Sequence, residues 1–304
     1  MSDTSRPARD PERGVHRPVL LREVVRTLEL EPGLTAVDGT IGAGGHSREI
    51  LKHIGNTGTL IGLDRDPMML RLASRAISGP NCHLVAASYS QLSEVLSELG
   101  IERVDRILLD LGLSSDQLAD ESRGFSFGSA GLLDLRFDPA TGRPAWELLE
   151  DLDEDALESL LRQFGEERHS RSIARTVVRK RTSRPVRTAS DLAAAVDESI
   201  PATARKRGAS HPATRAFQAL RIAVNDELGH LERALDGTLY ASLAPEGIAA
   251  VIAFHSLEDR LVKQEFRRTD RWRNLTPKPL TPTAVEKRMN PRSRTAKLRA
   301  AKKK

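Results

Sequence analysis

The chain has 304 residues, of which 39% are hydrophobic and 29% charged, a composition that is ordinary for a globular protein in water. It has no apolar run near the ~20 residues of a membrane helix, its first residues do not resemble a secretory signal, and its single cysteine excludes an internal disulfide. The 47 lysines and arginines, against 42 acidic residues, favour a polyanionic partner such as nucleic acid. We expect a cytoplasmic protein without a membrane segment.

The N-terminal residues 1–14 are polar and rich in proline and arginine, so we expect them to be disordered. Order is expected to begin at His16, after which apolar residues recur at helical spacing as far as Leu28. Pro32 and Gly33 then end this helix and lead into a strand.

From residue 34 onward, short apolar runs alternate with stretches of helical periodicity. Strands are expected over 34–38, 59–64, 83–87 and 104–110, and helices over 46–54, 67–77 and 91–99. This alternation predicts an α/β fold with a doubly wound parallel sheet, which binds ligands beyond the carboxyl ends of its strands. Asp38, Asp64 and Asp110 each end such a strand. Tyr89 lies just past another, so we expect one rim with polar and aromatic groups.

The turn after the first expected strand is rich in glycine and reads Asp38-Gly-Thr-Ile-Gly-Ala-Gly-Gly-His-Ser47. Glycine accepts positive φ and lets a ligand approach the backbone, and a carboxylate such as Asp64 suits a ribose diol. A dinucleotide fingerprint has a third glycine where Ser47 stands, which disfavours NAD. The pattern suits S-adenosylmethionine better, with Asp38 or a backbone group meeting its ammonium. A tight turn without a ligand is the less favoured alternative.

The alternation stops after Asp110. Residues 111–144 are rich in glycine and serine and predict a long structured loop, a feature that is commonly functional. Phe125 and Phe127 in this loop are candidates to stack on a flipped-out base, and ordinary loop packing is an equal alternative.

A helical pattern without strand signals follows from about residue 146 to 200 and predicts a small all-helical insertion with an arginine-rich surface. One long amphipathic helix is expected over 214–235. A strand over 248–254 returns the chain to the sheet, and Ser256 and Asp259 are expected to cap the next helix.

The sheet domain is therefore expected to be discontinuous. Residues 15–115 and 212–304 would form its core, and residues 116–211 would form the loop and helical insertion that recognise the substrate. Residues 287–304 contain nine basic and no acidic residues. They predict a basic C-terminal tail that either binds RNA or is merely solvated.

Ten short segments, in order along the chain, resemble one bacterial protein family. They are His16–Leu20, Asp38–Ser47, Asp64–Pro67, Leu108–Ser115 with Gln117, Arg123–Phe127, Leu133–Arg136, Gly165–Arg168, His211–Arg215, Phe254–Arg260 and Asn290–Arg294. The family that they resemble methylates N4 of cytidine 1402 in 16S ribosomal RNA. The strings at 123–127 and 254–260 are far more specific than the glycine-rich turn, which many methyltransferases share.

The resemblance implies a Rossmann-like class I methyltransferase that uses S-adenosylmethionine and acts on the small ribosomal subunit near the decoding P site. The residues implied to bind the methyl donor are Gly44, Gly45, His46, Asp64 at the ribose, Tyr89 near the adenine, Asp110 and Gln117. The chain departs from the family pattern at Leu135 and Phe137, where methionines are usual, at Asp116, where proline is usual, and at Tyr89, where phenylalanine is usual. The first two keep apolar volume, and tyrosine still stacks on adenine.

Methylation of cytosine N4 requires an amine with a delocalised lone pair to attack and to lose a proton. Asp110 is a candidate to accept a hydrogen bond from N4; alternatively, it only holds the donor. His255 follows the fifth strand and is a candidate general base, although a structural role there is favoured. The histidines show no paired spacing, so no metal is expected.

Two further interpretations remain open, a nicotinamide-dependent oxidoreductase on a similar fold and a non-catalytic RNA- or ribosome-binding module. Ser47 counts against the first, and the second leaves the three rim aspartates without a role. The expected partner is 16S rRNA in the small ribosomal subunit, and both a monomer and a homodimer remain open.

Overall fold

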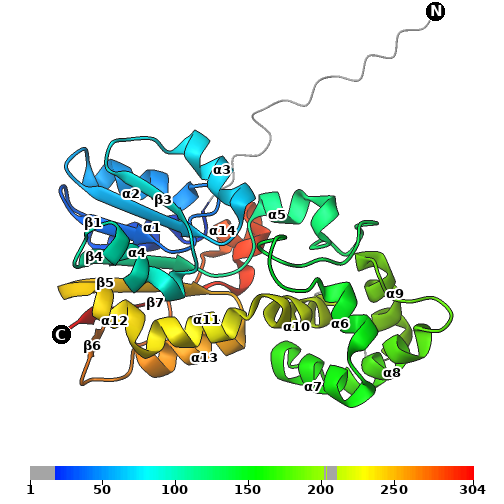
Figure 1. The fold of residues 1–304 in the computed structure, drawn as a ribbon. Coiled ribbons are helices and arrows are strands. Elements are labelled where there is room, and N and C mark those ends of the chain that lie inside the picture. Colours follow the sequence, from blue (N-terminus) through cyan, green and yellow to red (C-terminus); the bar gives the residue numbers. More distant parts are fainter. Residues whose placement is uncertain (1–17, 202, 204–210) are drawn as a thin grey trace, which may run out of the picture.

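The computed structural model describes residues 18–201, 203 and 211–304 (Figure 1). The segment predicted to be disordered, residues 1–14, lies outside this part of the chain, as does His16. None of the described helices is both long and apolar enough to span a lipid bilayer.

Within the described residues, seven strands form one sheet in the order β3-β2-β1-β4-β5-β7-β6. They are β1 (Thr35–Asp38), β2 (Thr59–Asp64), β3 (Cys82–Ala86), β4 (Val104–Asp110), β5 (Leu243–Ala253), β6 (Trp272–Asn274) and β7 (Lys297–Lys303). Strands β1 to β5 run parallel, whereas β7 lies antiparallel between β5 and β6. The predicted doubly wound, Rossmann-like sheet of a class I methyltransferase is confirmed.

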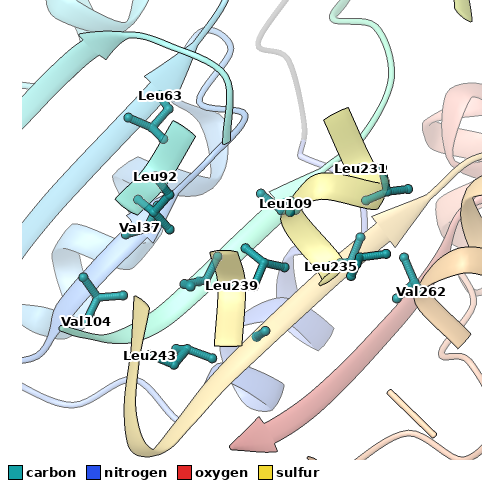
Figure 2. Close-up of a cluster of buried hydrophobic side chains, with 14 of the residues drawn as sticks. Val37, Leu63, Leu92, Val104, Leu109, Leu231, Leu235, Leu239, Leu243 and Val262 are labelled. Carbon is teal, nitrogen blue, oxygen red and sulfur yellow. The ribbon is translucent and has the colours of Figure 1, made fainter. Parts of the chain in front are cut away.

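Helices cover both faces of this sheet, as the alternating pattern predicts. One face carries α1 (Leu21–Leu28), α2 (Gly45–Ile54) and α3 (Pro67–Ala76), and the other carries α4 (Leu92–Glu98), α11 (Glu227–Arg233), α12 (Leu239–Ser242) and α13 (Ser256–Glu265). In Figure 2, Leu92, Leu231 and Val262 from three of the latter helices share one cluster with Val37 and Leu109 of the sheet. Each such side chain contributes about 1.5–3 kcal/mol on burial, which fixes the strand ends as a rigid base for a site.

A helical region lies beside the sheet (Figure 1). It comprises α6 (Ala145–Asp151), α7 (Glu154–Gly165), α8 (Ser170–Lys180), α9 (Ala189–Ser199) and α10 (Thr214–Asn225). Leu157, Ile173, Val196 and Leu220 are fully buried in a cluster of its own, so the predicted all-helical insertion is confirmed. Because α10 packs in this cluster, we propose Asp226, rather than residue 212, as the boundary of the sheet domain.

The single helix predicted over 214–235 is wrong. Asp226 adopts φ 49° and ψ 41°, in the left-handed region, and separates α10 from α11. Aspartate is among the few residue types that enter this region readily. Apolar residues continue at helical spacing across the break, so their period does not reveal it. The break turns α11 onto the sheet and places Glu227 at its first position.

The basic tail predicted for residues 287–304 is also wrong. The segment forms part of α14 (Ala284–Met289), the 3-10 turn η5 (Pro291–Thr295) and the strand β7. Leu298 and Ala300 are fully buried in the sheet, and the guanidinium of Arg299 donates to Asp259 at 2.7 Å. The apolar residues that make β7 an internal strand are few and small, and the surrounding lysines and arginines conceal them in the sequence.

Candidate active site

A pocket lies at the carboxyl ends of the parallel strands, where the segments that follow β1, β2, β3, β4 and β5 meet. It is lined by six of the residues implied to bind the donor, namely Gly45, His46, Asp64, Tyr89, Asp110 and Gln117. It is also lined by residues that the sequence did not single out, among them Phe254, Glu227, Glu258 and Arg292. Gly44, Asp38 and His255 stand outside the lining.

The glycine-rich turn owes its shape to two positive φ angles, 53° at Gly42 and 81° at Gly44. A Cβ atom at Gly44 would lie 2.6 Å from Cδ1 of Ile77, and a Cβ atom at Gly45 would lie 2.9 Å from Cγ of Pro18. Side chains are therefore excluded at both positions. Gly44 shapes the turn from behind, and bare backbone at the first turn of α2 faces the pocket.

Asp38 supports this turn. It is 1% exposed, and its Oδ2 accepts a hydrogen bond from Oγ of Ser47 at 2.6 Å while Oδ1 accepts one from the N–H of Thr40 at 3.3 Å. The expected contact between Asp38 and the ammonium of the donor is therefore not what this arrangement favours. Ser47, which stands where a dinucleotide site has glycine, is the partner that holds the buried carboxylate.

Asp64 and Tyr89 line the side of the pocket that belongs to β2 and β3. The two oxygens of Asp64 accept hydrogen bonds from the N–H groups of Gly42 and Asp66, both at 2.9 Å. Burial raises the pKa of Asp64 to about 7, and hydroxyl groups that donate to it would favour its ionised form. Tyr89 begins the turn η1 (Tyr89–Gln91), and burial raises the pKa of its phenol, which stays neutral.

Asp110 offers the pocket a carboxylate oxygen with unused hydrogen-bonding capacity. Its Oδ1 is buried and has no partner among the described residues, and its Oδ2 lies 3.4 Å from Nδ1 of His46. Nε2 of His46 donates to the carbonyl of Val19 at 2.9 Å, so in the neutral ring Nδ1 carries the lone pair, and burial lowers the pKa of His46. Burial raises the pKa of Asp110 to about 7, against the opposing charge of Arg292. Asp110 is thus a buried acid that titrates near neutral pH.

Gln117 lines the pocket, but its amide is committed to the loop after β4. Its Oε1 accepts from the N–H of Ser114 at 2.9 Å, and its Nε2 donates to Oδ2 of Asp66 at 2.8 Å. The same buried oxygen accepts from Arg123 at 3.2 Å, which ties the loop to the end of β2. The sequence missed the roles of Asp66 and Arg123, and their positions inside two of the resembling segments were the available signal.

His255 lies beside the pocket in a cluster with Glu227 and Glu258, whose ligand atoms lie within 4.8 Å of one another. As the cap of α13, Nδ1 of His255 accepts from the N–H of Glu258 at 3.4 Å, so the proton resides on Nε2. Nε2 lies 3.1 Å from Oε1 of Glu258 without aligning for a hydrogen bond, and Arg221 holds Glu227 by bonds of 2.7 and 2.9 Å. We propose that this cluster anchors α13, because His255 caps the helix and Arg221 holds Glu227, and that it serves neither as a metal site nor as a general base.

The two predicted caps of α13 make side-chain contacts instead. The hydroxyl of Ser256 donates to Glu166 at the end of α7, and Arg260 donates to the same carboxylate at 3.2 Å. Asp259 accepts from Arg299 of β7. Glu166 therefore links the helical region to the rim of the sheet, beside the pocket.

The side chains of Phe125 and Phe127 pack against other side chains of the protein. Phe125 is 5% exposed, with its ring 6.2 Å from that of Phe137. Phe127 stacks on His211 at 4.7 Å and meets Phe217 edge-on at 4.8 Å. Of the two alternatives, loop packing is the one the structure shows, and Phe137 is the aromatic of this loop that lines the pocket.

Comparison with known proteins identifies the family. The model of the MraW methylase family matches residues 13–304. The chain belongs to this family. Proteins named ribosomal RNA small subunit methyltransferase H match this methylase over almost their whole length. The protein from Heliobacterium modesticaldum is 42% identical over 95% of this chain and 98% of its own. The protein from Geobacter sulfurreducens is 44% identical over 95% of this chain and 98% of its own. The protein from Halorhodospira halophila is also 44% identical, over 96% of this chain and 95% of its own. The oxidoreductase and the non-catalytic interpretations are therefore wrong.

The methyl donor of this methylase is S-adenosylmethionine, and the pocket fits it. Asp64 and Tyr89 suit a ribose and an adenine at the ends of β2 and β3. Gly42 and Gly45 of the glycine-rich turn line the pocket without a side chain. The partnerless oxygen of Asp110 lies beyond it, at the end of β4. When bound, the donor supplies a methyl group activated by a sulfonium.

Proposed function

We propose that this methylase transfers the methyl group to N4 of cytidine 1402 in the 16S rRNA of the small ribosomal subunit, near the decoding P site. Support comes from the ten resembling segments and from the relatives, which are named for the RNA of the small ribosomal subunit. A ribosomal substrate agrees with the cytoplasmic location that we expect.

The observation that carries the proposal is the free Oδ1 of Asp110. A primary amine that attacks a sulfonium methyl must donate a hydrogen bond and then lose a proton, and Oδ1 is a buried acceptor at the end of β4 that has no partner in the part of the chain that the structure describes. As the N–C bond forms and the C–S bond breaks, Asp110 takes the proton from N4. The proton is taken up on Oδ1, while the other oxygen, Oδ2, stays beside Nδ1 of the neutral His46 at 3.4 Å.

We further propose that the loop after β4 and the helical region α6 to α10 hold the RNA. The arginines of the helical region are exposed but mostly paired, for example Arg175 with Glu154 at 3.3 Å and Arg187 with Glu150 at 2.6 Å. Exposed pairs of this kind contribute only about 0–1 kcal/mol, so a phosphate group can replace the carboxylate at little cost. Acidic neighbours thus keep the surface from binding polyanions indiscriminately, and RNA remains able to compete.

The test supplies methyl-labelled S-adenosylmethionine with small subunits that lack the modification and, separately, with naked 16S rRNA. We expect label on one of the two substrates, released as N4-methylcytidine and mapped to position 1402. The Asp110→Asn protein serves as the matched control, with label reduced to a small fraction. Label on a different nucleobase, or on neither substrate, would refute the proposal.

A further inference from the structure

The C-terminal segment reaches the donor pocket from the other end of the chain. Glu286 of α14 accepts a hydrogen bond from the N–H of Leu20 at 2.7 Å, which fastens the segment to the N-terminal wall of the pocket. Arg292 of η5 lines the pocket and donates to Oγ of Ser115 at 2.6 Å, at the start of α5 (Ser115–Ala119). Figure 1 shows α14 beside α5. Ser115 therefore holds the guanidinium, and the bond between Glu286 and Leu20 holds the segment that carries it.

The guanidinium of Arg292 is a positive charge in a pocket whose charged lining residues are mainly acidic. Five carboxylates line it, those of Asp64, Asp110, Asp116, Glu227 and Glu258. Two arginines accompany them, Arg65 and Arg292. Arg65 donates to the carbonyl of Asn225, and its guanidinium lies 6.0 Å from the ring centre of Phe137. Arg65 follows β2, on the side of the ribose, so Arg292 is the arginine on the side of Asp110.

We propose that Arg292 binds the α-carboxylate of S-adenosylmethionine. The inference rests on the proposed function only in its choice of methyl donor. Neighbouring strands lie about 4.8 Å apart, so the ends of β2 and β4, which are two strands apart, are separated by about 10 Å. A donor with its ribose at Asp64 therefore extends its methionyl part along the glycine-rich turn towards Asp110 and Arg292.

The chemistry of both partners supports this assignment. A carboxylate that enters a pocket lined with carboxylates is repelled unless a cation lies next to it. A guanidinium is planar and rigid, and two of its N–H groups match the two oxygens of a carboxylate. A further N–H group can donate to a hydroxyl at the same time. Arg292 also lowers the pKa of Asp110, so one cation offsets both negative charges at the transfer end of the pocket.

The test compares ligands that differ at the amino acid. Calorimetry on the full chain would measure S-adenosylhomocysteine, decarboxylated S-adenosylmethionine and methylthioadenosine, the last of which lacks the whole amino acid part. Arg292→Gln should weaken S-adenosylhomocysteine about 10- to 100-fold, as expected for a hydrogen bond between charged groups. Methylthioadenosine is uncharged and should bind wild type and variant equally, within about 2-fold, and decarboxylated S-adenosylmethionine, which has two positive charges and no carboxylate, should bind the variant at least as tightly. Retained affinity for these two ligands would also show that the variant folds.

Arg294→Gln is the matched control, because Arg294 is exposed in the same turn, and it should leave all three affinities unchanged. An equal loss for every ligand in Arg292→Gln would overturn the inference, since the effect would not depend on the carboxylate. Unchanged S-adenosylhomocysteine binding with weakened rRNA binding would overturn it in favour of a phosphate contact. If wild type bound no S-adenosylmethionine at all, the proposed function would fail, and this inference with it.

Discussion

The glycine-rich turn and the C-terminal segment contribute to the same pocket by opposite routes. The turn lies within one strand–turn–helix unit, in which the positive φ angles of Gly42 and Gly44 shape the backbone and Ser47 bonds to Asp38. The C-terminal segment reaches the pocket only because β7 pairs with β5 in the sheet. The turn η5 directly precedes β7 in the chain and is placed at the pocket by this pairing. A short motif therefore suffices to recognise the first region, whereas the second exists only once the sheet has formed.

The same contrast separates the two charged groups at the end of β4. Asp110 ends an apolar run, and the parallel-sheet rule places it at the ligand edge. Arg292 lies in a segment whose basic residues indicate only a solvated or RNA-binding tail. The residues around Arg292 in the sequence therefore do not indicate a site. Arg292 is placed in the site by the pairing of the neighbouring strand β7 in the sheet.

The largest effect is expected at Asp110, where the two regions meet. Asp110→Asn removes the proton acceptor and should lower kcat about 10²- to 10⁴-fold. Binding of S-adenosylmethionine should change far less, because Asp64, Tyr89 and Arg292 remain. Single-turnover methylation and calorimetry measure the two separately. A variant with kcat near wild type would leave Asp110 as a donor-holding residue only.

The stability of β7 tests whether the C-terminal segment belongs to the fold. Leu298 is fully buried, so Leu298→Ala should lower the free energy of unfolding by about 2–5 kcal/mol in urea titration. Met289, which is 63% exposed in α14, supplies the control, and Met289→Ala should stay within about 0.5 kcal/mol. If the two variants were equally stable, the C-terminal segment would be a tail and not part of the fold, and the contrast between the two regions would not hold.

Within the glycine-rich turn, Ser47→Ala leaves the buried carboxylate of Asp38 without its 2.6 Å partner. A lost hydrogen bond to a charged group costs about 1.5–3 kcal/mol, which urea titration should detect. Ser74→Ala, on the exposed face of α3, is the matched control, because it removes a hydroxyl that bonds only to its own helix. If both serines behaved alike, Asp38 would not depend on Ser47.

A smaller effect is expected from pH. Burial raises the pKa of Asp110 to about 7 in the folded chain, whereas an unfolded aspartate titrates near 4. The folded state therefore loses stability relative to the unfolded state as pH rises from about 4 to about 7, and the loss is constant above that. Asp110→Asn removes this loss, and its amide can donate to Nδ1 of His46.

Thermal unfolding of Asp110→Asn and wild type should thus differ little at pH 4, and the variant should gain on the order of 2–4 °C at pH 8. A gain that did not grow with pH would contradict a raised pKa. In wild type, methylation should also fall as pH drops below about 7, because the protonated carboxyl of Asp110 can no longer accept the proton from N4.

Much of the sheet could be predicted, because its parallel strands are covered on both faces and appear as short apolar runs. Several donor-site residues followed from the same rule and from motif resemblance, and the pocket brings together Asp64, Tyr89 and Asp110. For Asp38 the sequence left a backbone group as the alternative partner of the ammonium, because a strand-end carboxylate looks the same in sequence whether it faces a ligand or, like this one, bonds to a serine on the next helix. The break at Asp226 was missed because it leaves the apolar period intact.

The sequence by itself determined the parallel sheet, the glycine-rich turn and the rim carboxylates, because these depend on local periodicity and on residues a few positions apart. Only the tertiary structure decided that the basic C-terminus is an internal strand, that Phe125 and Phe127 are committed to packing, and that Arg292 lies in the donor pocket. Most of those outcomes depend on partners that are remote in the sequence, such as His211 for Phe127 and Ser115 for Arg292, which is 177 positions away. Contacts of that range are selected by burial and pairing in the assembled sheet, which no local pattern records.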